Sequence, residues 1–269
     1  MLEKKIQQTS FYIILLIILL SAPLGCERKS KEMFQKGEEF WLKGSYEEAA
    51  KIYTQILYEF PKSPFGDDAL FRLGEAHYLF FNDPEKAAGY FKELVQRHPK
   101  SKLAYKSQSY IASIYYHSLE DYNRSIMEYR KLISNFSYKG MADKHQLAIA
   151  DIYFKKGDLE QAIVEYKILI EDYPESRLVD EAKYKLGSVL YVLGRYKSAV
   201  EVYKELEEKG PKNPFFFDAK LEIARCFEEQ ERFDEAIVRY KELYRAYPEK
   251  TIVIQGIERA TKRMSERKR

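Results

Sequence analysis

The sequence predicts an all-α fold in which one helical hairpin is repeated six times. The clearest copy runs from Asp180 to Pro211, where two amphipathic segments are separated by a turn at Gly194. Four kinds of residue recur in register along the chain, at intervals of 37 or 38 residues. A proline closes five of the six copies, and proline ends a helix because it lacks the backbone N–H and clashes with the preceding turn.

Each repeated position has its own residue type. A small residue recurs in the first segment of each copy, as Gly37, Gly74, Ala112, Ala150, Gly187 and Ala224. A second small residue recurs early in the second segment, as Ala49, Ala87, Ser125, Ala162, Ala199 and Ala236. One helical turn later comes an aromatic residue, as Tyr53, Phe91, Tyr129, Tyr166, Tyr203 and Tyr240. The closing positions are Pro61, Pro99, Ser137, Pro174, Pro211 and Pro248.

The residue types at these positions have a physical explanation. Small residues let the two helices of a hairpin approach closely, and the aromatic fills the space between one hairpin and the next. A single hairpin cannot bury its own apolar face, so neighbouring hairpins must stack to form a continuous core. We therefore expect a helical repeat array with a core spread along its axis.

The pattern resembles the tetratricopeptide repeat, in which L-G-x2-Y, A-x3-F and a final proline recur. Matching first segments are Leu73-Gly74-x2-His77, Ile149-Ala150-x2-Tyr153 and Leu186-Gly187-x2-Leu190. The resemblance covers residues 31–250 and implies a right-handed solenoid of six hairpins. The repeats are longer than the family's roughly 34 residues. The surplus lies mostly just after the closing proline, as in PKSPFGDDAL.

Residues 1–25 have a different character and are predicted to be a signal peptide. Two lysines precede an unbroken apolar run of ten residues, Phe11 to Leu20. This run suits a secretory signal better than a membrane span, which needs about 20 residues. An uncleaved anchor helix, with the run extended through Leu24, is the alternative.

The end of this segment, Leu24-Gly25-Cys26, resembles a bacterial lipoprotein signal. That resemblance implies that Cys26 becomes the lipidated first residue of the mature chain, with residues 26–30 as a short charged tether. Pro23 departs from the family, which has Leu, Val or Ile there. Glu27, in place of an aspartate, favours the outer membrane, with the protein facing the periplasm.

The array is predicted to contain one irregular joint and a terminal cap. After the third hairpin Ser137 replaces the proline and Gly140 follows, which indicates either a slightly longer loop or a bend between two halves. Residues 251–269 are predicted to form a capping helix with a polar outer face, as a repeat array needs for solubility. Its basic tail indicates either contact with acidic headgroups or an acidic partner, or a frayed, solvated end.

Nothing in the sequence indicates catalysis. The four histidines, His77, His98, His117 and His145, are dispersed without the spacing of a metal site, and no phosphate-binding loop or nucleophile motif occurs. The formal net charge of +3 gives no nucleic-acid footprint. Cys226 is expected to be a small buried packing residue. We therefore expect no enzyme activity, cofactor, metal or small-molecule substrate.

A protein-binding groove is the better-supported function. In the tetratricopeptide family the first helices line the concave surface, which implies an aromatic stripe that would bind a peptide or a partner's helix. Packing of these rings between adjacent hairpins is an equally weighted alternative. The predicted groove residues are Phe34, Trp41, Phe71, Tyr78, Tyr116, Phe154, Tyr184 and Tyr191.

Among lipid-anchored repeat proteins, the chain resembles the BamD family of outer-membrane assembly lipoproteins. The resemblance rests on the lipidated start, the immediate first repeat MFQKGEEFWLKGSYEEAAKIY and the junction FPKSPFGDDAL. It implies that the protein binds the barrel-assembly protein and helps to insert outer-membrane β-barrels. The family has five repeats where this chain has six. A pilus-assembly lipoprotein and a Tol-Pal-type envelope protein are the alternatives.

Overall fold

The structure is a computed structural model that describes residues 26–245, 247 and 249–267. The predicted signal peptide, Pro248 and the last two residues of the basic tail lie outside the described residues. All regular structure in the described part is helical, which confirms the predicted all-α repeat fold. No helix within the described residues is long and apolar enough to cross a membrane.

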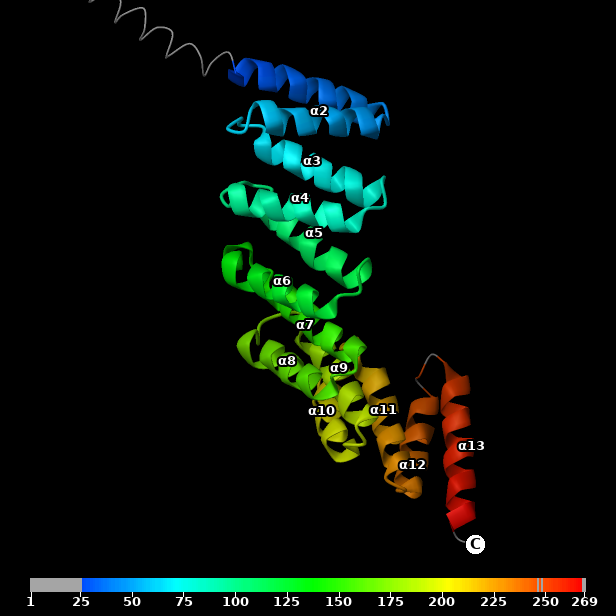
Figure 1. The fold of residues 1–269 in the computed structure, drawn as a ribbon. Coiled ribbons are helices and arrows are strands. Elements are labelled where there is room, and N and C mark those ends of the chain that lie inside the picture. The colour runs from blue at the N-terminus through cyan, green and yellow to red at the C-terminus, as the bar shows by residue number, and fades with distance from the viewer. Residues whose placement is uncertain (1–25, 246, 248, 268–269) are drawn as a thin grey trace, which may run out of the picture. The chain divides into compact units, whose positions relative to one another are not determined.

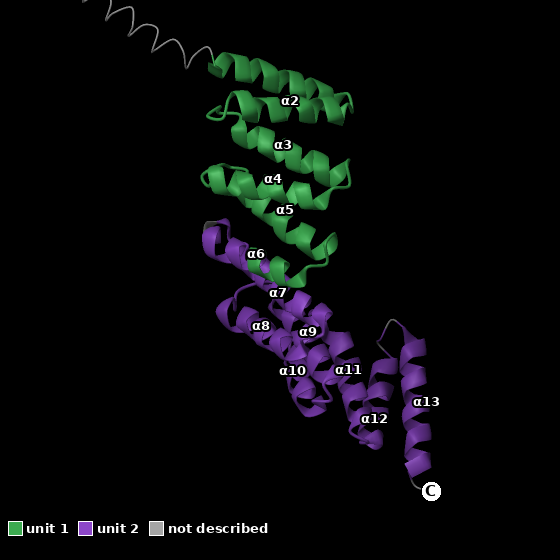
Figure 2. Cartoon of the chain, viewed as in Figure 1, with its two compact units in different colours: residues 1–128 green, residues 129–269 purple. Residues whose placement is uncertain are grey.

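The chain divides into two compact units, residues 1–128 and 129–269, with the division inside α6 (Figure 2). In each unit successive helices run side by side as hairpins (Figure 1). The first unit contains a helix over 26–42, α2 (Tyr46–Glu59), α3 (Gly66–Leu79), α4 (Pro84–Arg97), α5 (Ala104–His117) and the start of α6 (Tyr122–Asn135). The second contains the end of α6, a 3₁₀ turn (Ser137–Lys139), α7 (Ala142–Lys156), α8 (Leu159–Asp172), α9 (Val179–Val192), α10 (Tyr196–Glu208), α11 (Phe216–Glu229), α12 (Phe233–Tyr244) and α13 (Lys250–Arg267).

The turn of every hairpin contains one residue in the left-handed backbone region. In three hairpins it is a glycine, such as Gly44 with φ +78°, and glycine has no Cβ to oppose this conformation. In the other three a residue with a side chain accepts the strain, and those φ values lie between 49° and 57°. The six residues are Gly44, Asn82, Glu120, Gly157, Gly194 and Glu231.

The buried aromatic of the second helix lies directly on the small residue of the first helix. A Cβ added to Gly37 would stand 2.6 Å from the Tyr53 ring, and one added to Gly187 would stand 2.5 Å from Tyr203. Both rings are fully buried. The prediction that small residues allow close helix approach is therefore confirmed. The edge of the ring occupies the space that a side chain on the small residue would need.

A further small position, which the sequence analysis missed, lies on the next helix, 16 residues after the aromatic. At the end of the array it is Gly256, where an added Cβ would stand 2.7 Å from the Tyr240 ring. The corresponding Ala69, Ser107, Ala182 and Ala219 are all fully buried. The exception is His145, whose ring centre lies 5.8 Å from that of Tyr129. Five of the six rings thus have small residues at these positions on two different helices.

One expectation about the array needs correction. The connection after the third hairpin, residues 136–141, is as long as those at 60–65 and 98–103, so the longer-loop alternative is wrong. It differs instead by its 3₁₀ turn and by Gly140, whose φ is +62°. The segment expected as a tether, residues 26–30, is helical and continuous with the first helix.

Replacing Gly74 with alanine tests the ring contact. A Cβ there would stand 2.6 Å from the fully buried Phe91 ring, which has no room to move. We expect Gly74→Ala to lower the free energy of unfolding by about 1–3 kcal/mol in urea titration. Gly89→Ala is the control, because an added Cβ there meets nothing and alanine favours a helix by about 0.5–1 kcal/mol. Equal stability changes in the two variants would contradict this account of the core.

Candidate partner-binding surface

The predicted groove residues all lie on first helices of hairpins, as expected from their spacing. Several of them contact the next repeat along the chain. The ring centres are 5.4 Å apart for Phe34 and Phe65, and 6.0 Å apart for Phe71 and Tyr110. Tyr184 and Phe215 stack with 5.2 Å between centres. These rings join neighbouring hairpins, and Phe71 is only 5% exposed.

Three other groove aromatics pack on a ring at the start of the second helix of the same hairpin. Trp41 lies edge-on to Tyr46 with ring centres 5.1 Å apart, and Tyr191 packs in the same way on Tyr196 at 5.3 Å. Tyr116 packs on Tyr122, with ring centres 5.9 Å apart. The sequence analysis did not recognise this aromatic position at the start of the second helix.

The two remaining groove residues differ in exposure. Tyr78 is half-buried, and its ring centre lies 5.8 Å from that of Tyr110. Phe154 is 42% exposed. Packing between hairpins, the alternative role for these rings, is thus present at most positions. Their contact with a partner stays a prediction, and Phe154 has the largest free ring surface for it.

Beside the rings, acidic and basic side chains connect consecutive repeats of the first unit. The Tyr53 hydroxyl donates to Glu38 Oε1 at 2.6 Å, because a buried hydroxyl needs an acceptor. Arg72, from the next repeat, donates to both oxygens of Glu38 at 2.8 and 2.7 Å and to Glu75 at 3.0 Å. The Arg72 guanidinium also lies 4.8 Å from the centre of the Trp41 ring. Burial first, and then the Glu38 carboxylate, raise the pKa of Tyr53.

The second unit repeats this arrangement with different residues. The Tyr166 hydroxyl donates to Asp151 at 2.6 Å, and Lys185, 34 residues after Asp151, donates to the other carboxylate oxygen at 2.7 Å. In the next repeat Tyr203 and Ser188 share a hydrogen bond of 3.1 Å. Polar residues beside the groove therefore hold the repeats in register.

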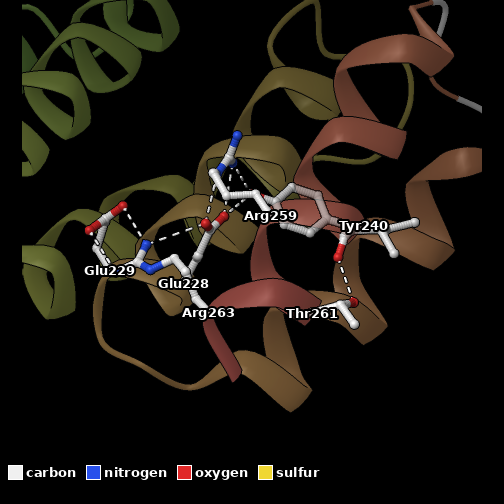
Figure 3. Close-up of polar contacts among 7 residues, drawn as sticks. Glu228, Glu229, Tyr240, Arg259, Thr261 and Arg263 are labelled. Carbon is white, nitrogen blue, oxygen red and sulfur yellow. Dashed lines mark hydrogen bonds and ion pairs between the residues drawn. The ribbon is translucent and has the colours of Figure 1, made fainter. Parts of the chain in front are cut away.

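The last such contact centres on Glu228, which is only 1% exposed (Figure 3). Arg259 of α13 donates to its two carboxylate oxygens at 2.7 and 2.8 Å, and the Tyr240 hydroxyl donates at 3.1 Å. Arg263 bridges Glu228 at 3.3 Å and Glu229 at 3.1 Å. Burial alone would raise the pKa of Glu228, but the hydrogen bonds and charge of Arg259, with Tyr240 and Arg263, lower it.

These contacts revise the interpretation of the basic C-terminal segment. Arg259 and Arg263 are neither frayed nor directed to an external acid, because they pair with α11 of the same chain. Arg267 pairs with Glu231 at 3.1 Å. Helix α13 extends to Arg267. Glu228 occupies on α11 the position that Tyr191 has one repeat earlier, and there it binds the capping helix instead of presenting a ring.

A second inter-repeat contact was also missed in the sequence. The Ser101 hydroxyl, two residues after the closing proline, donates to Asp67 at 2.5 Å and accepts from the Leu103 backbone N–H at 3.0 Å. Ser176 and Asn213 repeat both contacts, to Asp143 and Asp180. The visible signal was the serine or asparagine at a fixed distance from the proline and from an aspartate 33 or 34 residues earlier.

The described side chains form neither a metal-binding cluster nor an activated thiol. No group of three or more His, Cys, Asp or Glu within the described residues is arranged to hold a metal ion. Cys226 is fully buried, and burial raises the pKa of its thiol to about 12, so it is not an activated nucleophile.

Stacked helical hairpins with a small–aromatic core and inter-repeat ion pairs define a helical repeat protein. Sequence profiles of the tetratricopeptide repeat match residues 68–101, 147–214 and 184–250, which together make up just over half of the chain. The chain belongs to the tetratricopeptide repeat family. It is accordingly a protein-interaction scaffold of the tetratricopeptide type.

Solved structures share this fold at low sequence identity. A tetratricopeptide repeat protein from Parabacteroides merdae is 12% identical, with a TM-score of 0.50 over 87% of this chain and 99% of that chain. The C-terminal part of a repeat protein from Cytophaga hutchinsonii is 16% identical, with a TM-score of 0.54 over 79% and 78%. YrrB, described as having an unusual peptide-binding site, is 14% identical, with a TM-score of 0.51 over 78% and 99%. No curated protein sequence matches the chain.

Replacing Glu228 with glutamine tests the contact between α11 and the cap. The carboxylate is buried and charge-assisted, so we expect a loss of about 1–3 kcal/mol in the free energy of unfolding at pH 7. Because the folded-state pKa of Glu228 is lowered, its contribution is complete above its ordinary pKa of 4.5 and disappears as the pH falls through the folded value. The difference between Glu228→Gln and the parent should therefore shrink in acid.

The control is Glu266→Gln, since Glu266 pairs with Lys262 only at 3.9 Å on the exposed face. Such surface pairs contribute about 0–1 kcal/mol. A pH-independent stability difference for Glu228→Gln would show that the carboxylate charge does not hold the cap.

Proposed function

We propose that this protein is a lipid-anchored, non-catalytic scaffold of the bacterial cell envelope that acts in outer-membrane β-barrel assembly. The observation that carries the proposal is the place of Cys26. In the sequence it follows the apolar run and Leu24-Gly25, and in the structure it is exposed and lies in the same helix as the first repeat. An acyl anchor on this residue would tie the array directly to a membrane without an intervening flexible linker.

The anchor fits the energetics of lipidation. Each buried methylene contributes about 0.8 kcal/mol, so one acyl chain binds reversibly whereas two or more hold a protein firmly. The localisation that we propose is the outer membrane, with the array facing the periplasm. By the BamD resemblance the partner is the barrel-assembly protein.

Partner binding is assigned to the aromatic face of the first helices. Tetratricopeptide repeats bind peptides or proteins, and aromatic side chains contribute strongly to such interfaces. Half-buried rings such as Tyr78, held by their neighbours, are already ordered and lose little conformational entropy when a partner binds. Phe154 adds a ring with a large free surface.

Cys26→Ser tests the anchor. We expect the full-length variant to move from the membrane fraction to the soluble fraction, because it has no thiol for acylation. Cys226→Ala is the control and should stay with the membrane, because Cys226 is a buried residue of α11 and Cys26 is still present for acylation. Membrane retention of Cys26→Ser would instead favour an uncleaved anchor helix and reject lipidation.

Co-purification from gently solubilised envelope tests the partner. We expect mass spectrometry to find a large outer-membrane barrel protein with the parent chain. Tyr78→Ala and Phe154→Ala should lower its recovery by about 5- to 30-fold, the effect of losing 1–2 kcal/mol at an interface. Tyr58→Ala is the matched control, because Tyr58 is 87% exposed on a second helix.

Recovery of a different partner in the same experiment would change the proposed role. If pilus proteins, or Tol-Pal and other cell-wall proteins, co-purify instead, the protein is still a scaffold but does not act in β-barrel assembly. Equal recovery with all three variants would place the binding surface away from the aromatic face.

A further inference from the structure

One edge of the first unit brings the start of the first helix together with two inter-repeat connections. We call it the junction edge: Cys26 and the connections 60–65 and 98–103. In Figure 1 these connections lie at the left ends of the helices, whereas the hairpin turns of the same unit lie at the right. Arg97 joins the two connections by donating to the Pro61 carbonyl oxygen at 3.1 Å.

Cys26 lines a surface hollow on this edge. The hollow has a volume of about 380 Å³, and its walls include Phe60, Pro61 and Pro64 beside Cys26. Both prolines are exposed. An apolar rim around the attachment point is favourable beside the acyl region of a bilayer and unfavourable in water.

The same edge carries three lysines that form no ion pair in the part of the chain that the structure describes. Lys62, Lys100 and Lys102 are exposed, and none has an ion-pair partner among the described residues. The other charges of the edge are largely paired: Lys29 faces Glu59 at 3.9 Å, and Arg97 pairs with Glu93 at 2.6 Å.

The remaining acids of the junction edge equal these lysines in number, but two of them are hydrogen-bonded or partly buried. Glu27, in the wall of the hollow, is exposed. Asp67 accepts the Ser101 hydroxyl, and Asp68 lies near Lys102, with a pKa raised first by burial and then by Asp67. Lys62 lines the hollow, and the exposed Lys100 and Lys102 lie on the neighbouring connection.

The opposite edge has fewer unpaired cations. In the hairpin turns of the first unit Asp83 pairs with Lys86 at 3.1 Å and Asp121 pairs with Arg124 at 3.2 Å. Lys43 and Glu120 are the remaining charges of these turns. Among the described residues, the turn edge therefore has one unpaired lysine where the junction edge has three, and Cys26 lies on the junction edge.

We propose that the junction edge of the first unit lies on the bilayer surface, with Lys62, Lys100 and Lys102 against anionic lipid headgroups. This inference rests on the proposed lipid anchor at Cys26. The anchor alone would leave the orientation free. Each lysine near an anionic surface favours the contact by about fivefold, so the three together would favour this orientation by about 100-fold.

The test measures which edge is near the membrane, using the full-length, acylated protein reconstituted in vesicles that contain phosphatidylglycerol. A fluorophore is attached through Pro64→Cys on the junction edge or through Lys43→Cys on the turn edge. With Cys26 acylated and Cys226 buried, the introduced thiol is the reactive one. Spin-labelled lipid headgroups in the bilayer quench a fluorophore that lies near them.

We expect several-fold stronger quenching at position 64 than at position 43. The triple variant K62E/K100E/K102E should stay in the vesicle pellet but lose that difference, as should the parent in phosphatidylcholine vesicles. High salt should weaken it too, since about 1 M salt shortens the screening length to about 3 Å. The matched control K36E/K43E/K51E has the same charge change at exposed lysines away from the junction edge and should keep strong quenching at position 64.

The outcomes separate the inference from the proposed function. Pelleting of the parent with equal quenching at both positions, or stronger quenching at 43, would overturn the orientation and leave the anchor. An unchanged difference in K62E/K100E/K102E would overturn the role of the lysines. Absence of the parent from the vesicle pellet would overturn the lipid anchor and this inference with it.

Discussion

The contact on which the structure depends is a buried aromatic ring seated on a residue that has almost no side chain. At Gly37, Gly74 and Gly187 even a single methyl group would overlap the ring of the second helix. That distance sets how closely the two helices of a hairpin approach. The Tyr240 ring also lies on Gly256 of α13, so the same kind of contact joins the last hairpin to the capping helix. A fully buried side chain of this kind contributes roughly 1.5–3 kcal/mol, and an interior packed at this density has no space for a larger neighbour.

Most of these rings are tyrosines, and their hydroxyls generate the polar contacts of the first helices. A buried hydroxyl left without an acceptor would cost about 1–3 kcal/mol. Glu38, Asp151 and Glu228 provide the acceptors, and these half-buried or buried carboxylates then need cations of their own. Arg72, Lys185 and Arg259 come from the next repeat or from the cap. Core packing and charge pairing therefore specify the same register between neighbours.

This arrangement limits which residues are free to recognise a partner. Charged side chains beside the predicted groove residues, such as Glu38 and Arg72, are already engaged with each other, and several of the groove aromatics hold adjacent repeats together. What remains available is partly exposed ring surface, as at Phe154, and the two edges where the helices end. The edges differ because one is built from proline-closed connections with unpaired lysines and the other from tight turns whose aspartates pair with nearby cations.

The sequence by itself determined the fold class, the repeat spacing and the main core positions. These follow from local rules, since a small residue, an aromatic and a proline at fixed spacing allow few other structures. It did not reveal the small position at Gly256 or the link from Ser101 to Asp67, because both join residues on different helices whose approach depends on the packed array. For the same reason the basic tail was misread. Only the tertiary structure brings Arg259 to Glu228, two residues 31 positions apart that have no local pattern in common.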